Sequence, residues 1–137
     1  MQQVVLCVNG QYDVLDSWFS EYGIKRAMLV CGKSINRLAI NRYVETLSDR
    51  LDARIVRFME FQPNPLYENV VAGVNRFREE NCDAILAIGG GSAMDVAKCI
   101  KLYSNMPGDG ENGAYLKQTI QPNQLPFLAM PTTSGTG

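Results

Sequence analysis

At 137 residues the chain is long enough for one domain with a single core, and 46% hydrophobic and 20% charged residues are typical of globular proteins. Thirteen Lys and Arg are spread among fourteen Asp and Glu, which argues against a nucleic-acid-binding surface. The N-terminal apolar run is far too short for a signal peptide or a membrane span, so we expect a cytoplasmic protein.

Short apolar strands alternate with longer segments of helical period along the chain. The strands are expected at residues 4–8, 26–31, 53–58, 84–88 and 127–130. Such alternation predicts parallel strands joined by helical crossovers. The expected fold is therefore α/β, with a mostly parallel sheet flanked by helices.

The first two helices are expected at residues 13–22 and from about 35 to 51. Gly23 would end the first helix, because glycine tolerates the left-handed conformation that follows many helices. One face of the second helix is apolar and should pack on the sheet; it carries Ile40, Tyr43, Val44, Leu47 and Leu51.

The third helix is expected from about residue 65 to 81, with Asn64 as its cap and Pro65 at its first position. Its buried stripe would consist of Val70, Val71, Val74 and Phe77. The fourth helix begins at Ser92 and would bury Val96, Ala97 and Ile100. Residues 104–124 are rich in Gly, Asn, Pro and Gln, which predicts a long, exposed connection.

Three consecutive glycines stand between the buried strand at 84–88 and the helix that begins at Ser92. Glycines there allow a sharp turn and close approach of a ligand, and the free N–H groups of a helix start favour an anion such as a pyrophosphate. A purely structural alternative is equally good, because Ser92 and Asp95 match the S-x-x-D capping box. The loop is neither the G-x-G-x-x-G fingerprint nor a P-loop.

Residues 132–137, a run of hydroxyls and glycines, follow the last strand. Both this run and the glycine loop lie at carboxyl ends of strands, where open α/β sheets bind ligands. Its hydroxyls suit ribose or phosphate oxygens. Taken alone, an ordinary polar turn explains the run better.

The cysteines and the absence of histidine limit the chemistry of the chain. Cys7, Cys31, Cys82 and Cys99 have no C-x-x-C spacing and lie in apolar stretches, so we expect reduced core residues. Most catalytic zinc or iron sites and most general bases use imidazole, which this chain lacks. We therefore predict neither a metal ligand nor a catalytic residue within the chain.

Together these segments resemble the iron-containing (group III) alcohol dehydrogenase family. Three ordered motifs carry the resemblance: the Pro-Asn-Pro turn at 63–65, the segment from Cys82 through the glycines to Lys98, and the run from Pro131 to Gly137. The resemblance spans nearly the whole chain. It implies that residues 1–137 form a Rossmann-like domain that binds NAD or NADP, which in the family precedes a helical, metal-binding domain.

The resemblance also implies roles for individual residues. Contacts on the pyrophosphate side would come from Gly90, Gly91, Ser92 and Asp95. Contacts to the phosphate, the ribose and the nicotinamide side would come from Thr132, Thr133 and Thr136. Asn64 would face the adenosine half of the cofactor, although helix capping explains it equally well.

Gly32 and Lys33 occupy the position that sets cofactor choice in the family. NAD-preferring relatives place an Asp after the second strand, where its carboxylate binds the ribose 2′-hydroxyl and repels a 2′-phosphate. Glycine removes this repulsion, and Lys33 and Ser34 offer a charge and a donor. We therefore predict a preference for NADP(H). The alternative is that Lys33 is a solvated loop residue and that either cofactor binds.

By the same resemblance, the chain is the cofactor-binding part of a metal-dependent alcohol dehydrogenase or aldehyde reductase that acts on a small alcohol or aldehyde. Fe²⁺ or Zn²⁺ is expected only in the full-length protein, bound by an Asp and typically three His of the second domain. The family motif continues past Gly137 into Ser-Glu, so we expect a truncated sequence that is inactive by itself. Homodimers are usual in relatives, and the strand at 4–8 is a candidate edge contact.

Two other functions remain open. A glycerol dehydrogenase or dehydroquinate synthase would share the glycine loop and the downstream Asp, although residues 132–137 fit the iron-type family better. A stand-alone nucleotide-binding domain would bind cofactor without turnover and without metal.

Overall fold

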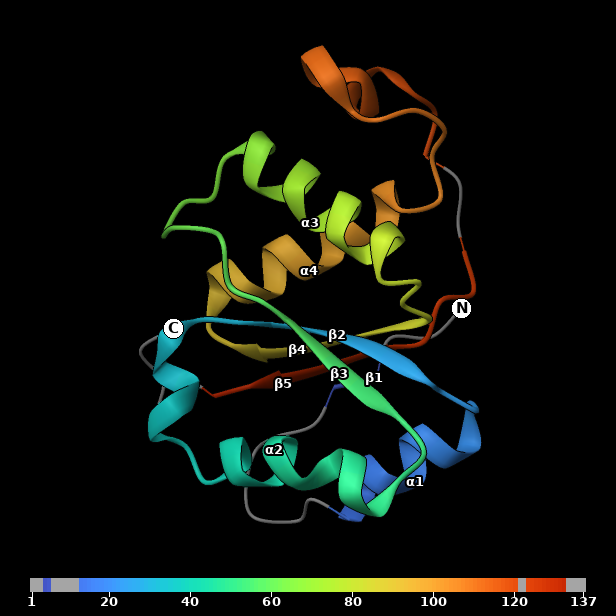
Figure 1. Ribbon diagram of the computed structural model, residues 1–137. Helices are drawn as coiled ribbons and strands as arrows, with labels where there is room; N and C mark the ends of the chain where they lie inside the picture. The colour runs from blue at the N-terminus through green and yellow to red at the C-terminus, as the bar shows by residue number, and fades with distance from the viewer. Residues whose placement is uncertain (1–3, 6–12, 121–122, 133–137) are drawn as a thin grey trace.

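One parallel sheet organises the domain (Figure 1). The computed structural model describes residues 4–5, 13–120 and 123–132. The strands are β1 (Val4–Val5), β2 (Arg26–Cys31), β3 (Arg54–Phe58), β4 (Ala84–Gly89) and β5 (Phe127–Pro131), and they lie in the order β1-β5-β4-β2-β3. Every pairing between them is parallel. The predicted α/β fold is confirmed.

Two helices cover each face of the sheet (Figure 1). The helices α1 (Asp13–Glu21) and α2 (Ile40–Arg50) pack on one face, and α3 (Tyr67–Glu79) and α4 (Gly91–Tyr103) pack on the other. Successive side chains of a strand point to opposite faces. In β2, Leu29 joins the core under α1 and α2, whereas Met28 and Val30 join the core under α3 and α4. Apart from Arg26, the central strands β2, β4 and β5 carry apolar residues on both faces because they serve two cores.

The helices bury the faces that their sequence periods predict. Residues less than 9% exposed include Ile40, Val44 and Leu47 of α2, Val70, Val74 and Phe77 of α3, and Val96, Ala97 and Ile100 of α4. The predicted face residues Tyr43, Leu51 and Val71 lie at the margins and are half-buried. Gly23 has a φ of +61° just after α1, as expected, and the Ile24 N–H donates to the Phe19 carbonyl at 3.0 Å.

The second helix differs from its prediction at its start. A 3₁₀ segment, η1 (Lys33–Arg37), comes first, Leu38 is extended, and α2 begins only at Ile40. In one continuous helix, Ile35 and Ile40 would point about 140° apart. The break at Leu38 allows both side chains to be buried in the same core, at 1% and 0% exposure.

Asn64 does not cap α3, which corrects one of the two predictions for this residue. The helix begins at Tyr67, and the Asn69 side-chain oxygen accepts a hydrogen bond from the Leu66 N–H at 2.7 Å. Asn64 has a φ of +56°. An N-cap residue has an extended backbone, which the positive φ of Asn64 excludes, and Leu66, with a φ of −88° and a ψ of 159°, takes the N-cap position instead.

The connection after α4 is not simply exposed, which also departs from the prediction. It contains a short 3₁₀ segment, η2 (Glu111–Lys117), in which Tyr115 is only 1% exposed. Arg78 of α3 donates to the Tyr115 hydroxyl at 3.0 Å and to the Gly108 carbonyl at 2.6 Å, and it also donates to the Met106 carbonyl. These hydrogen bonds hold the connection against α3.

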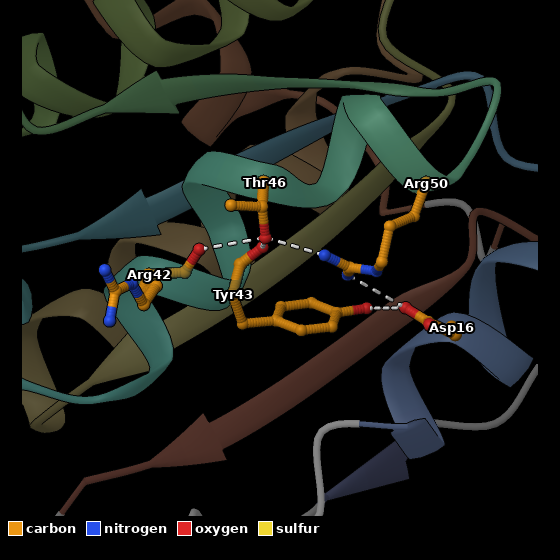
Figure 2. Close-up of polar contacts among 5 residues, drawn as sticks. All are labelled: Asp16, Arg42, Tyr43, Thr46 and Arg50. Atoms are coloured by element: carbon orange, nitrogen blue, oxygen red, sulfur yellow. Dashed lines mark hydrogen bonds and ion pairs between the residues drawn. The ribbon is translucent and has the colours of Figure 1, made fainter.

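A polar contact joins α1 to α2 (Figure 2). The Tyr43 hydroxyl donates to the Asp16 carboxylate, and Arg50 forms an ion pair with the same carboxylate at 3.3 Å. The Arg50 guanidinium lies 4.5 Å from the centroid of the Tyr43 ring. One carboxylate of α1 thus holds two side chains of α2, which fixes the orientation of α2 against the sheet.

Some predictions fall on residues outside the described ranges. These are the strand positions 6–8, Cys7, Thr133 and Thr136. In the part of the chain that is described, no helix is long and apolar enough to cross a membrane.

Candidate functional site

The connections of the sheet reverse direction between β2 and β4, which are neighbours. From β2 the chain passes over one face through α2 to β3, whereas from β4 it passes over the other face through α4 to β5 (Figure 1). Diverging connections leave a crevice at the carboxyl ends of the two strands, where α/β proteins bind ligands. The fold therefore places its candidate site beside the last residues of β2 and β4.

Three of the predicted segments meet at this edge of the sheet. Cys31 at the end of β2 pairs in register with Ile88, and Gly89 at the end of β4 pairs with Pro131. The Thr132 N–H donates to the Gly89 carbonyl at 3.1 Å. The structure thus brings together Gly32 and Lys33 after β2, the glycine loop after β4, and Thr132 after β5.

Gly89 shapes the turn from β4 into α4, as the three glycines at this junction predict. Its φ is +149°, which residues with a side chain rarely adopt, and an added Cβ would lie 3.1 Å from the Cβ of Ala93. The signal was present in the sequence, since Gly89 is the first of the three glycines. Its backbone directs the following residues across the strand ends.

The start of α4 has no side-chain cap. Gly90 is the N-cap, α4 begins at Gly91, and neither Ser92 nor Asp95 supplies a capping hydrogen bond. The capping-box alternative is therefore wrong. No acidic residue lies in the first turn, and an added Cβ on Gly91 would meet no atom within 4 Å.

Backbone donors are consequently available at the strand ends. Within the described residues, no acceptor outside the helix is present for the N–H groups of Gly91, Ser92 and Ala93. The first N–H groups of a helix have no partner within it, and they lie at the positive end of its dipole. This start of α4 can therefore bind an anion through its backbone.

Asn64 and Asp95 lie together in a separate hollow between α3 and α4. The pocket has a volume of about 470 Å³, and its walls include Tyr103 and the exposed Leu116 of η2. None of the described residues after β2 or β5 lines it. The structure thus divides the predicted site residues into a strand-end group and a pair on the α3 and α4 side.

The three described cysteines have free thiols, as predicted. Burial raises the pKa of Cys31 to about 11, and the positive charge of Arg57 offsets part of this effect. Burial also raises the pKa of Cys99, with a smaller contribution from the Asp95 carboxylate. Both thiols stay protonated at neutral pH, and a protonated thiol is neither a strong nucleophile nor a metal ligand.

The residues of this chain do not fit a catalytic metal. Across the described ranges no group of three or more His, Cys, Asp or Glu is placed to hold one, and the sequence contains no histidine. A nicotinamide cofactor fits better, because the uncapped start of α4 offers donors for its pyrophosphate.

Comparisons with known proteins agree with this geometry. The family described as iron-containing alcohol dehydrogenase matches residues 3–137. Alcohol dehydrogenase 4 of Schizosaccharomyces pombe is 33% identical over 83% of the chain. The NAD-dependent methanol dehydrogenase of Bacillus methanolicus is 32% identical over 85% of the chain. The sulfoacetaldehyde reductase of Bifidobacterium kashiwanohense, solved in complex with NAD⁺, matches 97% of the chain with a TM-score of 0.75 and 26% identity.

The chain spans about a third of the length of these proteins. It covers 27% of the Schizosaccharomyces pombe enzyme, 30% of the methanol dehydrogenase and 35% of the reductase. The matching part is the Rossmann-like α/β fold described above.

Proposed function

We infer the function from one premise: the chain belongs to the iron-containing alcohol dehydrogenase family. We propose that residues 1–137 are the cofactor-binding domain of an oxidoreductase that moves hydride between NAD(P)(H) and a small alcohol or aldehyde. The observation that carries this proposal is the uncapped start of α4 at the point where the sheet connections diverge. The named relatives act on such substrates, which supports the substrate class.

The pyrophosphate would lie against the N–H groups of Gly91, Ser92 and Ala93. Gly91 suits this role because it has no side chain to hold the phosphate away from the backbone. The Ser92 and Thr132 hydroxyls would add hydrogen bonds. Asp95, as a carboxylate, would accept hydrogen bonds from donors such as ribose hydroxyls rather than bind the phosphate itself.

The bound nicotinamide would supply or accept the hydride, while this chain binds and orients the cofactor. Among the described residues no group of three or more possible ligands fits the metal, so we assign no reaction step to a metal there. In the whole protein its ligands would come from a further domain.

We propose that NADP(H) is preferred over NAD(H). Gly32 leaves no carboxylate to repel a 2′-phosphate, and Lys33 is exposed beside it. One relative is named as NAD-dependent and another was solved with NAD⁺. A preference for NADP(H) would therefore distinguish this chain from both. Titration with NADPH and NADH, followed by nicotinamide fluorescence, should give the lower Kd for NADPH. Tighter binding of NADH would refute the preference but not the cofactor site.

The substitution Gly91→Ala tests the pyrophosphate site itself. The new methyl group meets no protein atom, so the thermal midpoint should stay unchanged. It would stand between the backbone and the phosphate and should raise the Kd for NADPH about tenfold, a change of about 1.4 kcal/mol. Lys98→Ala, at an exposed position of the same helix, is the control and should leave the Kd unchanged. Equal affinity in Gly91→Ala and the wild type would overturn the proposed site.

A further inference from the structure

Arg57 is one of two arginines in β3, the strand at one edge of the sheet. It pairs in register with Leu29 of β2 and is half-buried. Its Nη2 donates to the side-chain oxygen of Asn41 at 2.7 Å, in the first turn of α2. The guanidinium is thus held beside the start of α2, at the carboxyl edge of the sheet.

No carboxylate compensates this charge within the described residues. The ion pairs there join Lys25 to Asp52, Arg50 to Asp16, and Arg76 to Glu60 and Glu80. Glu60, which follows β3 closely in the chain, is therefore engaged by Arg76. Within these residues the guanidinium hydrogen-bonds only to a neutral amide, so it keeps donors that an anion from outside the chain can use.

The segment that leads from β2 into the first turn of α2 is cationic. Between Gly32 and Val44 the sequence contains Lys33, Arg37 and Arg42 and no carboxylate. The helix α2 starts without an acidic residue in its first turn and without a side-chain cap, so the positive end of its dipole adds to these charges. The positive charge of Arg57 also acts on Cys31, the residue directly before Gly32, and lowers the pKa of its thiol against the larger rise that burial causes.

A pocket opens beside Arg57. Its volume is about 520 Å³, and it includes Asn36 of η1 and Met59 just after β3, both at the carboxyl edge. Arg54, Glu45 and Ser48 also line it. The end next to Gly32 therefore combines positive charge with an apolar surface at Met59.

We propose that Arg57 is a specificity-determining residue that, together with Lys33, holds the 2′-phosphate of NADP(H). This inference rests on the proposed cofactor site: a ribose at the end of β2 would place its 2′-phosphate between the η1 segment and the held guanidinium. The adenine would extend over the end of β3 toward Met59. Asn41 acts as a positioning residue, because its side-chain oxygen fixes the guanidinium.

The test uses ligands that lack the nicotinamide, so that no reaction enters the measurement. Calorimetric titration of 2′-phospho-ADP-ribose and of ADP-ribose gives the ratio of their Kd values. Arg57→Gln should reduce the preference for the phosphorylated ligand about tenfold and leave the Kd for ADP-ribose unchanged. Arg57→Lys should retain part of the preference, because the charge remains. Arg54→Gln, a matched change on the same strand at the other edge, should alter neither value.

Equal weakening of both ligands in Arg57→Gln would mean a purely structural role and would overturn the inference, as would an unchanged ratio. A wild-type chain that binds ADP-ribose at least as tightly as its 2′-phosphorylated form would overturn it too, while leaving the cofactor site intact. Failure of the wild-type chain to bind either ligand would instead overturn the proposed function. Thermal midpoints of all variants separate these outcomes from misfolding.

Discussion

Cys31 illustrates how a single buried group makes stability depend on pH. Its side chain is 0% exposed, and burial favours the neutral thiol over the thiolate. The pKa is about 11 in the folded chain against 9.0 for an unperturbed thiol. Cys82 behaves in the same way, with a pKa of about 11 caused first by burial and then by the charges of Glu80 and Asp83.

We predict that the free energy of unfolding falls as the pH rises from about 9 to about 11. In this window the unfolded chain loses thiol protons that the folded chain keeps, so the unfolded state is favoured. Urea unfolding at several pH values measures the slope. Cys31→Ala should reduce stability at pH 7 but make the slope shallower. A slope equal to that of the wild type would contradict a raised pKa for Cys31.

Among the structural elements, the connection that contains η2 depends on one side chain of α3. Arg78 binds the carbonyl groups of Met106 and Gly108 and the hydroxyl of Tyr115, and Tyr67 accepts a hydrogen bond from the Tyr115 N–H at 3.0 Å. The rings of Tyr103 and Tyr115 stack with centroids 5.1 Å apart. Contacts to distant elements thus order a segment whose own sequence indicates a loop.

Arg78→Ala should destabilise the protein by about 2–3 kcal/mol, because several charge-assisted hydrogen bonds are lost, two of them to acceptors on the buried residues Met106 and Tyr115. The loss of structure should begin in the connection that contains η2. Hydrogen exchange measured by mass spectrometry should therefore increase in residues 104–120 more than in the sheet. Arg76→Ala, a change of the same type on the same helix, removes only ion pairs with well-exposed partners and should have a much smaller effect. If Arg78→Ala increased hydrogen exchange equally in residues 104–120 and in the sheet, this would contradict the proposal that Arg78 holds the connection against α3.

At the scale of the whole molecule, we propose that the sheet and its loops bind the cofactor but do not suffice for turnover. The chain contains no histidine and covers about a third of the enzymes it resembles. We therefore predict NADPH binding by residues 1–137 without alcohol oxidation, even with added Fe²⁺. Absorbance at the wavelength of reduced nicotinamide, with small alcohols as substrates, checks this. Turnover above background would contradict it, and absence of binding would remove the cofactor role as well.

The sequence alone determined the features that depend on neighbouring residues. Apolar runs and helical periods predicted all the strands and the four helices, because hydrophobic burial imposes a period on each element. The motifs also identified the family. The same local reasoning predicted a continuous second helix and a cap at Asn64, and it left a capping box at Ser92 open. In each of these three cases the structure differs from the local prediction, because packing or the conformation of an adjacent residue determines the backbone.

Only the tertiary structure decided which strand ends lie together. Strand order depends on pairings between segments more than 50 residues apart, such as Cys31 with Ile88, and no local pattern specifies them. The pairing of β2 with β3 places Arg57 opposite Leu29, and the pairing of β4 with β5 brings Thr132 beside Gly89. The sequence could therefore name candidate residues one by one, whereas their assembly into a site required the sheet, because long-range burial and hydrogen bonding choose the neighbours of each strand.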